Sequence, residues 1–126
     1  VTGSGDCSLK IWDLRKLENN NSNNELYSIP AHTKLITDVK FYHQSRDIMQ
    51  KQQQQDQDHL LGPEFNDGKF LVSCSYDGDV NIWSSDNWIK IKSLKGHTDK
   101  VMSCDINSTG KWIVSSGWDR SIKLWK

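Results

Sequence analysis

Residues 96–126 read GHTDKVMSCDINSTGKWIVSSGWDRSIKLWK, and this stretch decides the fold. Short runs of alternating apolar and polar residues are separated by the turn-forming segments STG and GWDRS. Alternation with a period of two over a few residues is typical of half-buried β-strands. The stretch also places Asp119 six residues ahead of Trp125. It therefore predicts short strands joined by tight turns and marked by an Asp–Trp pair.

The same pattern occurs twice more in the chain. Residues 73–84 read SCSYDGDVNIWS and residues 3–13 read GSGDCSLKIWD, again with an Asp six residues ahead of a Trp. Residues 31–41 read AHTKLITDVKF, which matches GHTDKVMSCDI at 96–106. The Asp–Trp pairs are Asp6/Trp12, Asp77/Trp83 and Asp119/Trp125, and the two aligned histidines are His32 and His97. Self-similarity of this kind indicates a repeat architecture.

The repeat has a period of about 42 residues, which is the separation of Trp83 and Trp125. Trp12 and Trp83 are 71 residues apart because two low-complexity inserts lengthen the copy between them. One insert is Asn-rich, at 17–25, and the other is Gln-rich, at about 42–68. Neither contains enough apolar residues to fold on its own, so both are predicted to be surface loops.

Short strands account for most of the remaining chain. Nine are expected, at 8–12, 26–29, 36–41, 69–74, 79–83, 89–94, 101–105, 111–115 and 121–125. The segments DGD at 77–79 and STG at 108–110 contain the residues that tight hairpin turns require. The chain is therefore predicted to be all-β.

Composition excludes several classes of function. The chain has 126 residues, with 16 Lys and Arg against 16 Asp and Glu, so its formal net charge is zero. A neutral chain has no field that would hold a polyanion, which disfavours a dedicated nucleic-acid or membrane-surface binder. No run approaches the roughly 18 apolar residues of a membrane span. The chain begins with Val1 and lacks a basic-then-apolar leader, so we expect a segment of a longer protein without a secretory signal.

The cysteines do not form a recognisable framework. Cys7, Cys74 and Cys104 are odd in number, lie far apart and include no Cys-x-x-Cys pair. This usage fits a reducing compartment, with the thiols as small buried side chains. The four histidines show no zinc-like spacing relative to the cysteines, so we expect no metal site and no cofactor.

A repeat of about 42 residues with Gly-His near its start and Trp-Asp at its end resembles the WD40 β-propeller family. The matching dipeptides are Gly96-His97 and Trp12-Asp13. Three positions depart from the pattern, namely Ala31 before His32, Ser84 after Trp83 and Lys126 after Trp125. The resemblance implies that the chain holds about two and a half blades of a seven-bladed propeller ring.

The resemblance also divides the chain into repeats, as the C-terminal part of such a propeller. Residues 1–16 would end one repeat and residues 17–25 would form the Asn-rich loop. Residues 26–88 would form a repeat that contains the Gln-rich insert, and residues 89–126 would form the last repeat.

The family resemblance implies a hydrogen-bonded chain of His, Ser or Thr, Asp and Trp inside each blade. Buried carboxylate and imidazole groups need such partners, and the indole N–H supplies a donor. The matching residues are His32, Ser73, Asp77 and Trp83 in one copy, His97, Ser115, Asp119 and Trp125 in the next, and Thr2, Asp6 and Trp12 in a copy without a His. The Ser, His and Asp could also suggest a hydrolase. We reject that interpretation because a catalytic triad would occur once, with its nucleophile in a cleft.

Proteins of this family act by binding rather than by chemistry, through residues at one end of the blades. The resemblance maps the positions three and five after the His, and one before the turn Asp. The candidates for partner binding are Leu35, Thr37 and Tyr76 in one copy and Lys100, Met102 and Trp118 in the next. Tyr76, Met102 and Trp118 are side chains of the kind that interface cores favour. Packing of Tyr76 and Trp118 against their own hairpins is an equally good alternative.

A narrower resemblance extends over residues 81–126 and, upstream, over GSGDCSLKIWDLRK, at 3–16, and YSIPAHTKLITDVKF, at 27–41. Its most distinguishing parts are SSDNWIKIKSLKGH, at 84–97, and the Ile-Pro-Ala-His phrase at 29–32. These stretches look like the C-terminal repeats of a WD40 subunit of the spliceosomal U4/U6 small nuclear ribonucleoprotein. That resemblance implies a nuclear scaffold that binds a pre-mRNA processing factor 3-like partner, with U4/U6 RNA contacted indirectly. The alternative is a WD40 adaptor of a ubiquitin ligase or signalling complex, and an enzyme ranks last.

Overall fold

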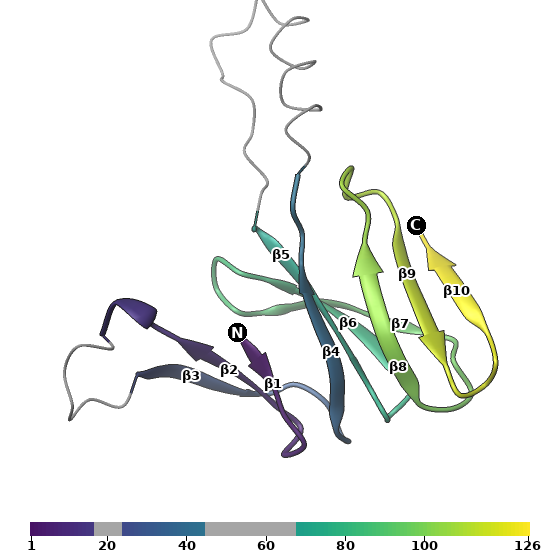
Figure 1. Cartoon of the computed structure of the whole chain (residues 1–126), viewed down its shortest axis with the longest axis horizontal. Helices are drawn as coiled ribbons and strands as arrows, with labels where there is room; N and C mark the ends of the chain where they lie inside the picture. The colour runs from purple at the N-terminus through teal and green to yellow at the C-terminus, as the bar shows by residue number, and fades with distance from the viewer. Residues whose placement is uncertain (17–23, 45–67) are drawn as a thin grey trace, which may run out of the picture.

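The computed structural model describes residues 1–16, 24–44 and 68–126, and the described chain folds into three antiparallel sheets that lie side by side (Figure 1). The first has the order β1 (Thr2–Gly3), β2 (Ser8–Trp12), β3 (Glu25–Pro30). The second has the order β4 (Ile36–Phe41), β5 (Phe70–Ser75), β6 (Asp79–Ser84), β7 (Lys90–Lys95). The third has β8 (Val101–Ile106), β9 (Ile113–Gly117) and β10 (Ile122–Trp125).

Apart from one turn of 3-10 helix, η1 (Leu14–Lys16), the described residues are strands and connecting segments. The predicted all-β class is therefore confirmed. None of the described helices is long and apolar enough to span a membrane.

The core lies between the sheets, and its position explains why β5 contains consecutive apolar residues. In β5 the consecutive residues Leu71 and Val72 are both fully buried, although they point to opposite faces. Leu71 joins a cluster with Leu9 of the first sheet, and Val72 joins a cluster with Val101 of the third. The second sheet is thus covered on both faces, which favours an apolar run over simple alternation.

Most strands lie where the sequence predicts them, and β2 and β4 match the expected ranges 8–12 and 36–41. The strand expected at 111–115 starts later, as β9, at Ile113. The reason is local, because Asn107 Oδ1 accepts the backbone N–H groups of Lys111 and Trp112 at 3.1 and 3.0 Å. Two amides that a strand would pair are therefore held in the turn.

The two predicted tight turns contain glycines in the left-handed region. Gly78 has φ of 89° and Gly110 has φ of 69°. Only glycine adopts these angles without steric cost, so the glycines of DGD and STG are required by the turn geometry.

The predicted Asn-rich and Gln-rich loops lie mostly outside the described residues. At the start of the second one, however, Tyr42 is buried and its hydroxyl donates a hydrogen bond to the Ser108 carbonyl at 3.2 Å. Tyr42 therefore belongs to the folded part rather than to the insert.

Strands β4 and β8, the first strands of the second and third sheets, each contain a break in the pairing register. The pairing register shifts between Ile36 and Asp38 in β4 and between Val101 and Ser103 in β8. The residues between them, Thr37 and Met102, therefore stand at β-bulges, which redirect a side chain out of the regular alternation.

Candidate interaction surface

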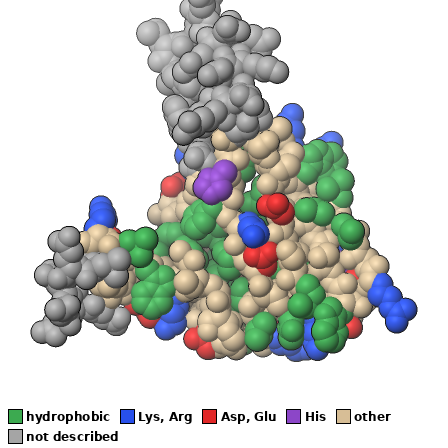
Figure 2. Space-filling model, viewed as in Figure 1, with side chains coloured by type: hydrophobic (Ala, Val, Ile, Leu, Met, Phe, Trp, Pro, Cys, Tyr) green, Lys and Arg blue, Asp and Glu red, His purple; other side chains and the backbone are tan. Residues whose placement is uncertain are grey.

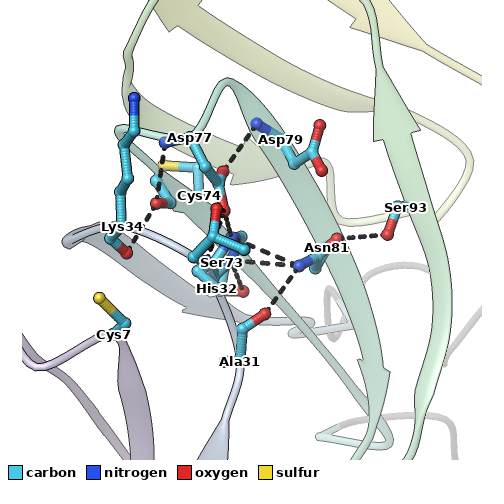
Figure 3. A network of polar contacts seen from close by, with 12 residues as sticks. Cys7, Ala31, His32, Lys34, Ser73, Cys74, Asp77, Asp79, Asn81 and Ser93 are labelled. Atoms are coloured by element: carbon cyan, nitrogen blue, oxygen red, sulfur yellow. Dashed lines mark hydrogen bonds and ion pairs between the residues drawn. The ribbon is translucent and has the colours of Figure 1, made fainter.

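The middle sheet contains a buried chain of hydrogen bonds around His32 (Figure 3). His32 Nδ1 lies 2.9 Å from Asp77 Oδ2, and His32 Nε2 lies 2.8 Å from Ser73 Oγ. Trp83 Nε1 donates to the same Ser73 Oγ at 2.9 Å. In the neutral ring, Nδ1 donates to the carboxylate, which can only accept. Ser73 then accepts from the indole, which can only donate, and donates to Nε2. One neutral tautomer thus satisfies every group.

The third sheet repeats this geometry with His97. Its Nδ1 lies 2.8 Å from Asp119 Oδ2, its Nε2 lies 2.8 Å from Ser115 Oγ, and Trp125 Nε1 donates to Ser115 Oγ at 2.9 Å. The structure therefore brings each of these two sequence-derived sets together.

The first sheet contains what remains of a third set. Trp12 Nε1 donates to Thr2 Oγ1 at 2.9 Å, and the Ser8 hydroxyl donates to Asp6 Oδ1 at 2.6 Å. Trp12 is 38% exposed, in contrast to the 4% of Trp83. Thr2 therefore occupies in the first sheet the position that Ser73 and Ser115 occupy in the other two, and each accepts a hydrogen bond from the indole ten residues later.

The carboxylates of these sets are held in their ionised form. Burial by itself would raise the pKa of Asp77, but hydrogen bonds from the Asp79 and Thr33 amides, together with His32, lower it overall. For Asp119, the hydrogen bond from the Ser121 hydroxyl is the largest cause, and it holds the pKa well below its usual range. Both aspartates are thus acceptors for the histidine rings.

The Ser–His–Asp geometry does not present a nucleophile. Ser73 is fully buried and Ser115 is 1% exposed, and each hydroxyl already joins an imidazole to an indole N–H. A substrate carbonyl has no route to either oxygen atom. The arrangement can stabilise a blade, whereas a hydrolytic step would require displacing the core.

The middle sheet also contains a second series of polar contacts, which no pattern in the sequence predicted. Asn81, 3% exposed, donates from Nδ2 to the Ala31 carbonyl at 3.1 Å and accepts from the Ser93 hydroxyl at 2.6 Å (Figure 3). The corresponding position in the third sheet is Lys123, which pairs with Ser115 as Asn81 pairs with Ser73. The hydrogen bond between Asn81 and Ser93 links β6 to β7, the edge strand of the second sheet. Lys123 cannot form the same contacts in the third sheet, because its side chain has no acceptor.

The cysteines were expected to be small buried thiols. Cys74 and Cys104 are buried, but Cys7 is only partly buried in the turn before β2, with φ of 70°. Among the described residues, no three or more His, Cys, Asp or Glu side chains are grouped so as to hold a metal ion.

At the opposite ends of the blades from Tyr42, three of the candidate binding residues form one cluster. Tyr76, in the β5–β6 turn, and Trp118, in the β9–β10 turn, have ring centroids 6.4 Å apart. Lys100, just ahead of β8, places its Nζ 4.9 Å from the Tyr76 centroid and 4.3 Å from that of Trp118. We call Tyr76, Lys100 and Trp118 the aromatic–lysine cluster. Figure 2 shows hydrophobic and basic side chains gathered at the edge where the β5–β6 turn lies in Figure 1.

The cluster shows how the two aromatic residues pack, whereas their contact with a partner stays a prediction. Tyr76 and Trp118 pack against each other across two sheets, not on their own hairpins alone, and Trp118 is still 56% exposed. The sequence did not reveal this contact because it joins residues 42 positions apart through Lys100.

The other candidates differ in what they offer to a partner. Leu35 and Met102 are 39% and 37% exposed. Thr37 instead donates its hydroxyl hydrogen bond inward, with the Val101 carbonyl oxygen at 2.8 Å and the Cys74 carbonyl oxygen at 3.1 Å. From its position at the bulge, Thr37 in the second sheet therefore forms a hydrogen bond to the third sheet.

Comparisons with known proteins agree with this geometry. The WD40 family model, described as "WD domain, G-beta repeat", matches residues 65–84 and 88–126. The U4/U6 small nuclear ribonucleoprotein PRP4 of Saccharomyces cerevisiae is 42% identical over 101 residues, 80% of this chain and 17% of the relative. A PRP4-like protein of Arabidopsis thaliana is 47% identical over 62 residues, 49% of this chain and 11% of the relative.

Other relatives carry different names. The nuclear distribution protein PAC1 of Komagataella phaffii is 30% identical over 124 residues, 98% of this chain and 20% of the relative. This chain thus spans a fifth or less of the length of these three relatives. The resemblance of its repeats to pre-mRNA processing factor 4 agrees with the two PRP4 matches. From its matched repeats and its three antiparallel sheets, the chain carries WD40 repeats and folds as part of a WD40 β-propeller.

Proposed function

We propose that this chain is the interaction module of a nuclear pre-mRNA splicing factor. The protein would be a subunit of the U4/U6 small nuclear ribonucleoprotein and of the U4/U6.U5 tri-particle that contains it. The observation that carries this proposal is the 42% identity to PRP4 over 80% of the chain, compared with 30% identity to PAC1.

The module binds protein and performs no chemistry of its own. Buried serines in the two His-containing sets and the exposed aromatic–lysine cluster support this division of roles. Its partner is a pre-mRNA processing factor 3-like protein of the U4/U6 particle. Contact with U4/U6 RNA is indirect, which fits a chain whose formal net charge is zero. The repeats at 26–88 and 89–126 supply the binding face.

Affinity purification of the tagged full-length protein from nuclear extract tests the proposal. We expect splicing proteins and U4/U6 RNA to be recovered with the parent, and the RNA to be lost when the protein–protein contacts are broken. The variant Tyr76→Ala/Trp118→Ala should lose the partner. Tyr27→Ala, on the outermost strand β3 and 58% exposed, is the matched control and should retain it. Recovery of cullin-type or signalling proteins instead would favour an adaptor of another complex and overturn the splicing role.

A further inference from the structure

The aromatic–lysine cluster holds a positive charge at a defined place on the binding face. The rings of Tyr76 and Trp118 are tilted by 45° to one another, and the Lys100 ammonium lies within 5 Å of both centroids. A cation over an aromatic face is attracted by the ring quadrupole. The two rings therefore hold the Lys100 side chain in place before any partner binds.

The backbone around Lys100 is also fixed. Its carbonyl accepts the Trp118 N–H at 2.8 Å, and its own N–H donates to Asp99 Oδ1 at 2.8 Å. A lysine held by both its main chain and its side chain loses less conformational entropy on binding than a free surface lysine does.

Lys100 has no carboxylate partner among the described residues. The nearby aspartates Asp77 and Asp119 are engaged by the histidines, and Asp99 caps the backbone of Lys100 rather than its ammonium group. Aromatic rings attract the charge but take none of the three N–H donors as a carboxylate oxygen would. The ammonium group is thus oriented, flanked by apolar surface and available as a donor.

We propose that the aromatic–lysine cluster binds an Asp or Glu side chain in an acidic segment of a protein partner, with an apolar neighbour of that side chain packing on Trp118. This inference rests on the proposed role as a protein-interaction module and deepens it. A charge-assisted hydrogen bond from Lys100 would fix the carboxylate, and the 56% exposed indole would supply the apolar contact.

The same geometry disfavours a nucleic-acid ligand. A base that stacked on the ring faces covered by Lys100 would have to displace the ammonium group. A carboxylate approaches the ammonium group without moving it. The zero net charge of the chain also gives no overall attraction for a polyanion.

A peptide-binding experiment on the full-length protein tests the proposal. The probes are a fluorescein-labelled peptide with two glutamates between two leucines, the same peptide with glutamines, and a ten-nucleotide oligouridine. We expect the parent to bind the glutamate peptide at least about fivefold more tightly than the glutamine peptide at low salt. Lys100→Met should abolish this preference while keeping the aliphatic contact, and Lys100→Arg should retain it. Tyr27→Ala, on β3 and outside the aromatic–lysine cluster, is the control that should leave the preference unchanged.

Equal binding of the two peptides, or a preference unchanged in Lys100→Met, overturns the proposal. Tighter binding of the oligouridine than of the glutamate peptide, lost in Lys100→Met, also overturns it.

Capture from nuclear extract separates this inference from the splicing role. If the parent and Lys100→Met recover splicing proteins equally, the cluster proposal fails and the splicing role stands. If the parent recovers none but shows the Lys100-dependent preference for glutamate, the splicing role fails and the cluster proposal stands.

Discussion

Replacing Ser73 with alanine removes the atom that joins the buried histidine to the buried tryptophan. Ser73 Oγ lies 2.8 Å from His32 Nε2 and 2.9 Å from Trp83 Nε1. The serine is fully buried, the His32 side chain has no exposed surface, and Trp83 is 4% exposed. Neither partner can therefore turn to water when the hydroxyl is lost.

The expected cost follows from the two groups that lose the Ser73 hydroxyl, of which His32 Nε2 keeps only a 3.4 Å contact with Asn81 Nδ2. An unsatisfied buried polar group costs about 1–3 kcal/mol, so Ser73→Ala should lower the free energy of unfolding by about 2–5 kcal/mol. In a double-mutant cycle with Trp83→Phe, the two changes should not add, because each removes the same hydrogen bond.

Urea-induced unfolding of the full-length protein, followed by tryptophan fluorescence, measures this effect. Ser116→Ala is the matched control, because this hydroxyl forms no hydrogen bond with the described residues and the side chain is only partly buried. It should change the free energy of unfolding by less than about 0.5 kcal/mol. Equal small losses in Ser73→Ala and Ser116→Ala would refute the assignment of a stabilising role to the buried chain.

Three further changes follow from the packing between sheets and from titration. Gly117→Ala should lower the free energy of unfolding by about 1–3 kcal/mol, because a Cβ there would lie 2.8 Å from the Lys100 carbonyl oxygen. A thermal melt should show a lower midpoint, and an unchanged midpoint would contradict this. Thr37→Val should lower the free energy of unfolding, measured by chemical denaturation, by about 1 kcal/mol. The substitution removes the 2.8 Å hydrogen bond from the Thr37 hydroxyl to the Val101 carbonyl oxygen and leaves the side-chain volume nearly unchanged. The pKa of Asp77 is lowered despite burial, by its hydrogen bonds and His32, so its stabilisation is complete above its ordinary value of 3.8 and is lost as the pH falls below it. Asp77→Asn should therefore unfold more easily at neutral pH and show a flatter acid transition in melts, and an identical acid transition would contradict the linkage.

Local patterns predicted much of the fold. The ranges of β2 and β4 follow from alternation between turn residues, and Gly78 and Gly110 adopt the positive φ that their turns require. These features depend on neighbours in the sequence, so a single sequence contains the information. The late start of β9 could not be foreseen, because it depends on the side-chain rotamer of Asn107.

The contacts within the candidate site were harder to predict from the sequence than the strands were. The repeats align His32 with His97, and the family resemblance implied the residues that bond to them. The sequence could not show that Lys100 lies between Tyr76 and Trp118, nor that Thr37 bonds across to Val101, because both contacts arise from the packing of one sheet against the next. Asn81 was missed for a different reason, as the third repeat has Lys123 there and alignment shows no shared pattern.

Site-specific photocrosslinking tests most directly the claim that this face holds a protein of the splicing particle. A photoreactive amino acid is placed in the full-length protein at the position of Trp118 or, as a control of similar exposure, at that of Tyr27 on β3. Irradiation in nuclear extract is followed by identification of the crosslinked proteins. We expect a crosslink from position 118 to a protein of the U4/U6 particle and little from position 27. Crosslinks to that particle from position 27 alone, or only to proteins outside the splicing machinery, would contradict it.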